Sequence, residues 1–279
     1  MNFSAETELI NLAKTHYENF PVGSFLIPSR YRKPIHLIYT FARVADDIAD
    51  EGNAPESVRL QKLDEWENLL SEAVAGKSSD RFFRELADAI QQWNLSVQLL
   101  SDLLIAFRMD VLATRYKTFD DVLKYCSYSA NPIGRLLLHI FNSASNENVE
   151  LSDSICTALQ LANFWQDISV DIHKNRFYIC TDEAEKFSVS EEDFRLQRKK
   201  EECLKLLQFQ IERTRALFEQ GKPLVHLVNK NFQFELKMIW QGGVRILEKT
   251  ILLGESVLYT RPRLSVVDKV IVCYRAIKM

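Results

Sequence analysis

Two pairs of aspartates, each repeated along one face of a predicted helix, constrain the fold of this 279-residue chain more than any other feature. The first pair is Asp46 and Asp50, and the second is Asp167 and Asp171. A rotation of about 100° per residue brings side chains four positions apart onto the same face. Apolar residues surround both pairs, whereas a solvated helix usually interleaves Lys and Glu partners. We therefore expect these carboxylates to line the interior of a helical protein.

Other polar residues share these two faces. Tyr39 and Arg43 precede the first aspartate pair, and Gln160 and Asn163 precede the second, each at helical spacing. Asp47 lies about 100° round from Asp46 and is a weaker candidate for the same face. Each polar stripe is therefore longer than a single acidic pair.

Inward carboxylates require a cation. Two carboxylates about 6 Å apart repel by roughly 3 kcal/mol at an effective dielectric near 20. Oxygen ligands with few His or Cys nearby suit Mg²⁺, whose coordination is commonly completed by water and substrate phosphates. A single aspartate pair more often caps or salt-bridges a surface helix, but two such stripes with Arg43 and Asn163 on them favour a metal-dependent phosphate site.

The composition agrees with an all-helical protein. Gly occurs 8 times and Pro 7 times, which leaves room for long helices, and 47% of the residues are hydrophobic, enough for a sizeable core. No linker or low-complexity tract divides the chain, so we expect one domain over residues 1–279. The net charge of −3 argues against a general nucleic-acid binder.

The hydrophobic pattern predicts a series of helices, and two residues mark the start and the end of the helix that carries the first aspartate pair. Pro34 is expected in the first turn of its helix, and Gly52 is expected to end that helix. Asn131-Pro132-Ile133-Gly134 predicts either a kink that lines a cavity or a break between two ordinary helices. The predicted helices are 5–18, 33–51, 56–75, 79–93, 97–115, 119–143, 151–173, 191–219, 223–230, 232–259 and 265–277.

Three segments together carry a family resemblance. They are Arg43-Val44-Ala45-Asp46-Asp47-Ile48-Ala49-Asp50, the run from Tyr125 to Leu136 (YCSYSANPIGRL), and residues 160–171 followed by Lys174-Asn175-Arg176-Phe177-Tyr178. With these segments the chain resembles the squalene and phytoene synthase family of class I isoprenoid synthases over most of its length. The resemblance implies an all-α single-domain bundle with a central active-site cavity.

The resemblance also implies roles for individual residues. Asp46, Asp50, Asp167 and Asp171 would be catalytic and bind several Mg²⁺ ions that neutralise a departing diphosphate. For Arg135, a phosphate contact and a structural ion pair are equally open. The implied substrate-binding residues are Arg43, Arg176, Tyr39, Asn163, Gln160, Tyr125, Lys174 and Arg135.

Within the family, the chain looks most like the bacterial hydroxysqualene synthases of hopanoid pathways, on the basis of Asn19-Phe20-Pro21-Val22, the run Asp46-Asp47-Ile48-Ala49-Asp50-Glu51, and Asn163-Phe164-Trp165-Gln166-Asp167. Condensing members usually carry a Ser-rich basic segment where this chain has residues 17–21, and an Arg where it has Gln166. Both departures suggest one bound diphosphate, and hence conversion of presqualene diphosphate and water to hydroxysqualene without NADPH. The alternatives are a condensing prenyl synthase that makes presqualene diphosphate, phytoene or dehydrosqualene, an NADPH-dependent squalene synthase, and a noncatalytic lipid-binding or assembly-factor homologue.

The remaining expectations concern location and partners. The five cysteines show no metal or disulfide spacing, and no secretory signal or membrane span is apparent, which favours a cytoplasmic protein. Residues 261–278 mix apolar with basic side chains, which suggests peripheral contact with the inner membrane, although ordinary packing of a last helix explains the pattern too. We expect an isoprenoid diphosphate as the small-molecule partner, no nucleic acid, and contact with neighbouring pathway enzymes.

Overall fold

The computed structural model describes residues 27–113 and 115–279, and this part of the chain contains helices and no strand. The all-α prediction is therefore confirmed, while the predicted helix 5–18 lies outside the described residues. The α-helices are α2 (Ser29–Asp50), α3 (Glu56–Val74), α4 (Arg81–Gln92), α5 (Val97–Val111), α6 (Phe119–Ser129), α7 (Asn131–Ile140), α8 (Asn146–Asp171), α9 (Thr181–Lys186), α10 (Glu191–Arg195), α11 (Lys200–Gly221), α12 (Leu224–Leu227), α13 (Lys230–Leu252) and α14 (Val266–Lys278). Two short 3₁₀ helices are η1 (Ile172–Lys174) and η2 (Gly254–Leu258).

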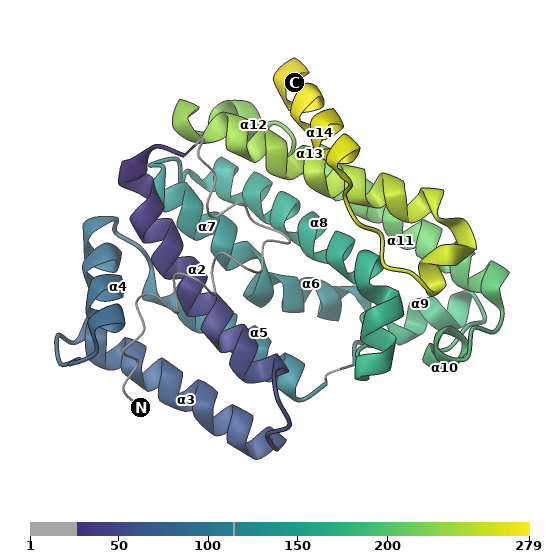
Figure 1. The fold of residues 1–279 in the computed structure, drawn as a ribbon, viewed down its shortest axis with the longest axis horizontal. Coiled ribbons are helices and arrows are strands. Elements are labelled where there is room, and N and C mark those ends of the chain that lie inside the picture. The colour runs from purple at the N-terminus through teal and green to yellow at the C-terminus, as the bar shows by residue number, and fades with distance from the viewer. Residues whose placement is uncertain (1–26, 114) are drawn as a thin grey trace.

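Helix α8 runs through the middle of the bundle and organises its C-terminal half (Figure 1). It packs against α7, α11 and α13, while α2 packs against α3, α4, α5 and α7 on the other side. The two helices that carry the acidic stripes therefore have largely different neighbours and share only α7 among those named here. None of the described helices has a stretch long and apolar enough to cross a membrane.

Helix α8 begins at Asn146, five residues before the predicted start. Its cap explains the difference, because the Ser145 hydroxyl accepts a hydrogen bond from the backbone N–H of Asn148 at 3.2 Å. Buried apolar residues then follow along the helix, among them Ile155, Leu161 and Trp165. The long apolar face of α8 places the second acidic stripe beside the core.

Two expectations about α2 had different outcomes. The helix begins at Ser29, after Pro28, so Pro34 lies inside it and not in the first turn as predicted. Gly52 adopts a φ of 77° just after the end of the helix, as expected for a residue that terminates it. The corrected start adds a turn of helix before the first acidic stripe.

The Asn131-Pro132-Ile133-Gly134 segment separates two helices, since α6 ends at Ser129 and α7 begins at Asn131. The segment is therefore a break between two helices, and it also lines the central cavity through Ser129, Ala130 and Ile133. A Cβ on Gly134 would lie 2.4 Å from Ser152 Oγ, so glycine allows α7 to approach α8 closely. This close approach sets the position of the cavity wall.

Other boundaries also differ from the prediction. The predicted helix 191–219 is divided into α10 and α11, because Gln197 and Lys199 adopt positive φ between them. The predicted helix 232–259 begins at Lys230 and ends at Leu252, and η2 follows it. Helix α9 was not predicted at all. Short capped turns of this kind leave little periodic signal in the sequence.

Candidate active site

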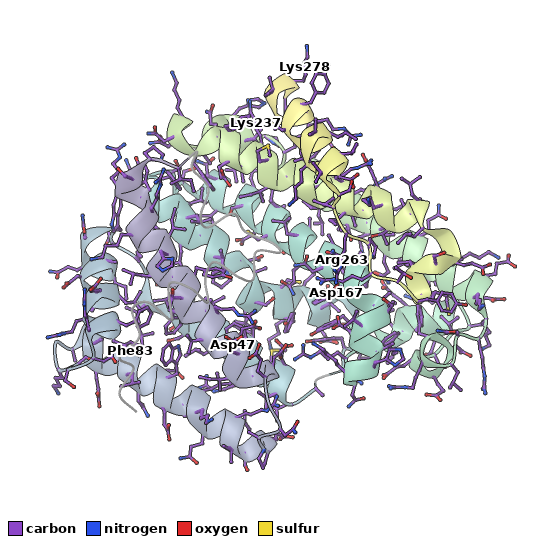
Figure 2. The ribbon with its side chains drawn as sticks, in the orientation of Figure 1. Asp47, Phe83, Asp167, Lys237, Arg263 and Lys278 are labelled. Carbon is purple, nitrogen blue, oxygen red and sulfur yellow. The ribbon has the colours of Figure 1, made fainter. Side chains whose placement is uncertain are left out.

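A single cavity of about 560 Å³ lies between α2, α7, α8 and α13 and brings the two stripes together. Asp46 and Asp50 line it from α2, and Asp167 and Asp171 line it from α8. Figure 2 shows the two helices on opposite sides of this region, with Asp47 labelled on α2 and Asp167 on α8. Four carboxylates far apart in the sequence thus face one space.

Arginines hold the first stripe. Arg43 Nη1 lies 3.1 Å from Asp46 Oδ2, and Arg43 Nη2 lies 2.5 Å from Asp47 Oδ1. Asp50 lies one turn further along α2. Arg176, which follows η1, donates to both oxygens of Asp50, with Nη1 2.9 Å from Oδ2. Asp47 does not line the cavity, in agreement with its weaker candidacy.

The second stripe has an arginine partner that the sequence did not reveal. Arg261, in the segment between η2 and α14, donates to both oxygens of Asp167, with Nη2 3.1 Å from Oδ2. The neighbouring Gln166 is buried and donates to the carbonyl of Pro262 at 2.8 Å. Position 166 therefore faces the 259–265 segment and contributes nothing to the cavity wall.

For two of the four aspartates, the structure disfavours the ionised form of the side chain. Burial, with a smaller contribution from Asp50, raises the pKa of Asp46 to about 6. Burial and then the charge of Asp167 raise the pKa of Asp171 to about 7. A bound cation would remove this cost, because it stabilises the ionised forms.

The carboxylate oxygens are the type of ligand that Mg²⁺ prefers, although they do not lie close enough together to form a complete metal site. Among residues 27–113 and 115–279, no three His, Cys, Asp or Glu side chains are grouped closely enough to hold a metal ion. One aspartate of each pair is bonded to an arginine: Asp50 to Arg176, and Asp167 to Arg261. Ligands divided between two walls suit Mg²⁺ that is completed by substrate phosphates and water.

Most of the other predicted site residues also line the cavity. They are Tyr39 and Arg43 on α2, Gln160 and Asn163 on α8, Lys174 at the end of η1, and Arg176 just beyond. Arg135 is an exception, because it forms a two-point ion pair with Asp153 of α8, with Nε 2.9 Å from Oδ1. Of the two alternatives left open for Arg135, this geometry favours the structural ion pair.

Tyr125 is the second exception, because it lies behind the cavity wall. Its hydroxyl donates to Asp110 on α5 at 2.9 Å, and the hydroxyl of Tyr178 donates to the same carboxylate at 3.3 Å. The Tyr178 ring stacks on Phe164, which lines the cavity, with ring centroids 3.7 Å apart. Burial raises the pKa of Asp110 to about 7. Asp110 was not predicted as a site residue, because a single Asp in an apolar helix belongs to no recognisable spacing pattern.

The rest of the cavity is mainly apolar. Phe107, Ile133, Leu137, Phe164, Phe232 and Ile239 line it. Glu235 of α13 also lines the cavity and is itself buried, with 3% of its surface exposed. The cavity therefore has an acidic end with arginines, an apolar wall, and one additional carboxylate. This arrangement can bind a molecule that has an anionic head and a long hydrocarbon body.

The squalene/phytoene synthase family model matches residues 13–268 of the chain. This protein belongs to that family. The match covers both acidic stripes and most of the described helices, so the family resemblance seen in the three sequence segments is confirmed.

Individual relatives narrow the comparison within the family. The hydroxysqualene synthase of Rhodopseudomonas palustris is 37% identical over 214 residues, which are 76% of this chain and 72% of the relative. That of Sinorhizobium fredii is 35% identical and covers 80% of this chain and 75% of the relative. The chloroplastic phytoene synthase of Narcissus pseudonarcissus is 30% identical over 75% of this chain and 50% of its own length.

Solved structures give the same fold. The squalene synthase HpnC from Alicyclobacillus acidocaldarius superposes with a TM-score of 0.82 at 35% identity, covering 88% of this chain and 93% of that one. A dehydrosqualene synthase in complex with a ligand has a TM-score of 0.86 at 20% identity, covering 97% of this chain and 94% of its own. At that identity, the second comparison supports the fold alone.

Proposed function

We propose that this protein converts presqualene diphosphate and water to hydroxysqualene and diphosphate, as a lyase of isoprenoid and hopanoid biosynthesis. The observation that carries the proposal is the single cavity in which two arginine-held acidic stripes meet an apolar wall. The names of two relatives at 35% and 37% identity support the same reaction. The proposal includes one catalytic domain formed by the whole chain.

The four aspartates Asp46, Asp50, Asp167 and Asp171 are the proposed ligands of several Mg²⁺ ions. When bound, these ions neutralise the charge that develops on the departing diphosphate. Arg43, Lys174 and Arg176 add fixed positive charge to the same end of the cavity, and Arg261 joins them. The substrate-binding role extends to Tyr39, Gln160 and Asn163, which can orient the head group or its water.

The chemistry then proceeds in the apolar part of the cavity. The carbon–oxygen bond to diphosphate breaks with its electron pair on oxygen, and the resulting cyclopropylcarbinyl cation rearranges to an allylic cation. The oxygen of one water forms the new carbon–oxygen bond and loses a proton. We assign Glu235 to hold this water and accept its proton, because it is the carboxylate that lines the cavity away from the aspartate stripes.

Binding of one diphosphate is supported by Gln166. Its buried side chain donates to Pro262 and brings no positive charge to the cavity. The second departure from condensing enzymes, at residues 17–21, lies outside the described residues. One diphosphate suits a preformed C30 substrate, because condensation requires two prenyl diphosphates held in reacting geometry.

The test is product identity. The purified protein is incubated with presqualene diphosphate and separately with farnesyl diphosphate, each with and without NADPH, and the products are identified by mass spectrometry. We expect hydroxysqualene from presqualene diphosphate at a rate indifferent to NADPH, with ¹⁸O from labelled water in the alcohol. NADPH-dependent squalene would indicate a reductive squalene synthase, and a C30 product from farnesyl diphosphate would indicate a condensing enzyme. No metal-dependent release of diphosphate would favour a noncatalytic homologue.

The same proposal places the protein in the cytoplasm with a peripheral contact at the inner membrane. Its expected substrate and product are lipids, which partition into the bilayer. Contact with neighbouring pathway enzymes remains a further expectation of this proposal.

A further inference from the structure

Helix α14 presents an apolar stripe to solvent. Five large apolar side chains on this 13-residue helix are between 62% and 78% exposed: Val266, Val267, Val270, Tyr274 and Ile277. At about 100° per residue, all five fall within an arc of about 100°. Exposed single hydrophobic residues are ordinary on protein surfaces, but a contiguous apolar stripe of this kind marks an interaction site.

The opposite face of α14 holds the helix onto the protein. Asp268, Val272 and Ala276 are buried on that face. Asp268 accepts hydrogen bonds from Arg245 Nε at 2.8 Å and from Lys249 Nζ at 2.6 Å, both on α13. The helix is therefore already packed onto the protein through its other face, and the apolar stripe is an exposed surface of a fixed helix.

The charges around the stripe indicate what it binds. Lys269 and Lys278 are exposed and flank the stripe on its two sides, at about −60° and 120° from Val266. Arg263, exposed just before the helix, adds a third positive charge. The one acidic residue of α14 is Asp268, which is buried and neutralised by its partners on α13. The exposed surface of α14 thus combines an apolar stripe with an exclusively basic border.

We propose that the outer face of α14 docks on an anionic lipid surface, with the five apolar side chains inserted among the acyl chains and the basic residues at the head groups. An apolar stripe bordered by Lys and Arg is the pattern of helices that lie in a membrane interface. Anionic lipid complements its charge, whereas a second copy of the same basic face would bring like charges together. This inference adds a surface to the proposed function and does not require turnover.

The position of α14 links this surface to the active site. The segment that enters the helix contains Arg261, which contacts Asp167, and Pro262, whose carbonyl is bonded by Gln166. Figure 2 labels Lys278 at the far end of the helix from this segment. Docking through α14 therefore holds the bilayer on the side of the molecule where Arg261 contributes to the cavity wall.

The experiment measures binding of the full chain to vesicles without substrate. Wild type and the double variant Val270→Glu/Ile277→Glu are mixed with vesicles of phosphatidylglycerol and phosphatidylcholine, or of phosphatidylcholine alone, and bound protein is measured by flotation. The matched control is Val58→Glu/Val74→Glu, which places the same charges at exposed valines on α3, at the other side of the molecule (Figure 1). A third variant, Lys269→Glu/Lys278→Glu, reverses charge without touching the apolar stripe.

We expect wild type and the α3 control to bind the anionic vesicles equally, and both α14 variants to bind at least about tenfold more weakly. Unchanged thermal unfolding and unchanged turnover in detergent would show that the variants remain folded. Three results would overturn the inference: no wild-type binding to anionic vesicles, equal binding by the α14 variants, or a wild-type dimer in sedimentation that Val270→Glu/Ile277→Glu makes monomeric. The last would identify a second copy of the chain as the occupant. Failure of turnover alone would leave the vesicle result unaffected.

Discussion

Adjacent aspartates on α2 provide a matched test of the acidic site. Asp46 lines the cavity and Asp47 does not, although both pair with Arg43. We replace each with Asn, which keeps the size of the side chain and removes its charge. Diphosphate release from presqualene diphosphate is then measured at saturating Mg²⁺.

The magnitude follows from the position of the lost charge. Two unit charges about 4 Å apart attract by about 4 kcal/mol at an effective dielectric near 20, so a neutral amide at position 46 removes an interaction of that order with a bound cation. Part of this loss weakens metal binding in the ground state. We assign about 2.7 kcal/mol to the transition state, so Asp46→Asn should slow turnover by at least about a hundredfold. Asp47→Asn, which weakens only the contact that orients Arg43, should slow it by less than about tenfold.

Neither variant should unfold far below the wild-type temperature, since neither residue belongs to the apolar core and Asp46→Asn removes a charge that burial disfavours. Near wild-type turnover by Asp46→Asn at saturating Mg²⁺ would refute a metal-binding role for this residue. Equal losses of turnover in both variants would show that lining the cavity makes no difference, because a general loss of negative charge on α2 would then explain the effect.

Four further predictions follow. Because burial raises the pKa of Asp171 to about 7, its folded form holds a proton that the unfolded chain releases near 4, so metal-free protein should lose stability as pH rises between these values. Mg²⁺ should therefore raise the melting temperature more at about pH 8 than at about pH 5.5, and Asp171→Asn should flatten the difference. Arg261→Ala should raise the apparent KM at least about tenfold, whereas Arg263→Ala, two positions along the same segment, should not, in steady-state assays. Glu235→Gln should keep diphosphate release and shift the product from alcohol to hydrocarbon by elimination, as read by mass spectrometry. Asp268→Asn should lower stability by about 3 kcal/mol in urea unfolding, because Arg245 and Lys249 remain charged but lose their buried carboxylate partner. The wild-type contribution should be lost progressively as pH falls below about 4, since these partners hold the pKa of Asp268 well below its usual range.

Each of these has a contrary outcome. Mg²⁺ stabilisation that is independent of pH would disconnect Asp171 from the metal. Equal KM effects of the two arginine substitutions would indicate general electrostatic attraction of the substrate by this segment. An unchanged product ratio with Glu235→Gln would remove the carboxylate from water capture, and unchanged unfolding of Asp268→Asn would show that α14 is held by its apolar contacts alone.

Local periodicity explains why so much of the site could be predicted. The aspartates and the residues that precede them, such as Arg43 and Asn163, repeat at helical spacing, and that spacing fixes a common face without knowledge of the fold. The cavity confirms that both faces point inward. Helix ends were less predictable, since the start of α8 depends on the Ser145 cap and the division of α10 from α11 depends on two residues with positive φ.

Contacts between distant segments were decided only by the tertiary structure. Arg135 belongs to a matched motif, yet the close approach of α7 to α8 directs it to Asp153. Arg261 reaches Asp167 across 94 positions of sequence, and Asp110 receives hydroxyl donors from α6 and from residue 178. Such pairs have no period and no fixed spacing, because packing of separate helices brings them together. The sequence by itself determined the helical faces and their chemistry, whereas the packing of α2, α8 and α13 decided which charges share one cavity and which apolar face of α14 remains exposed.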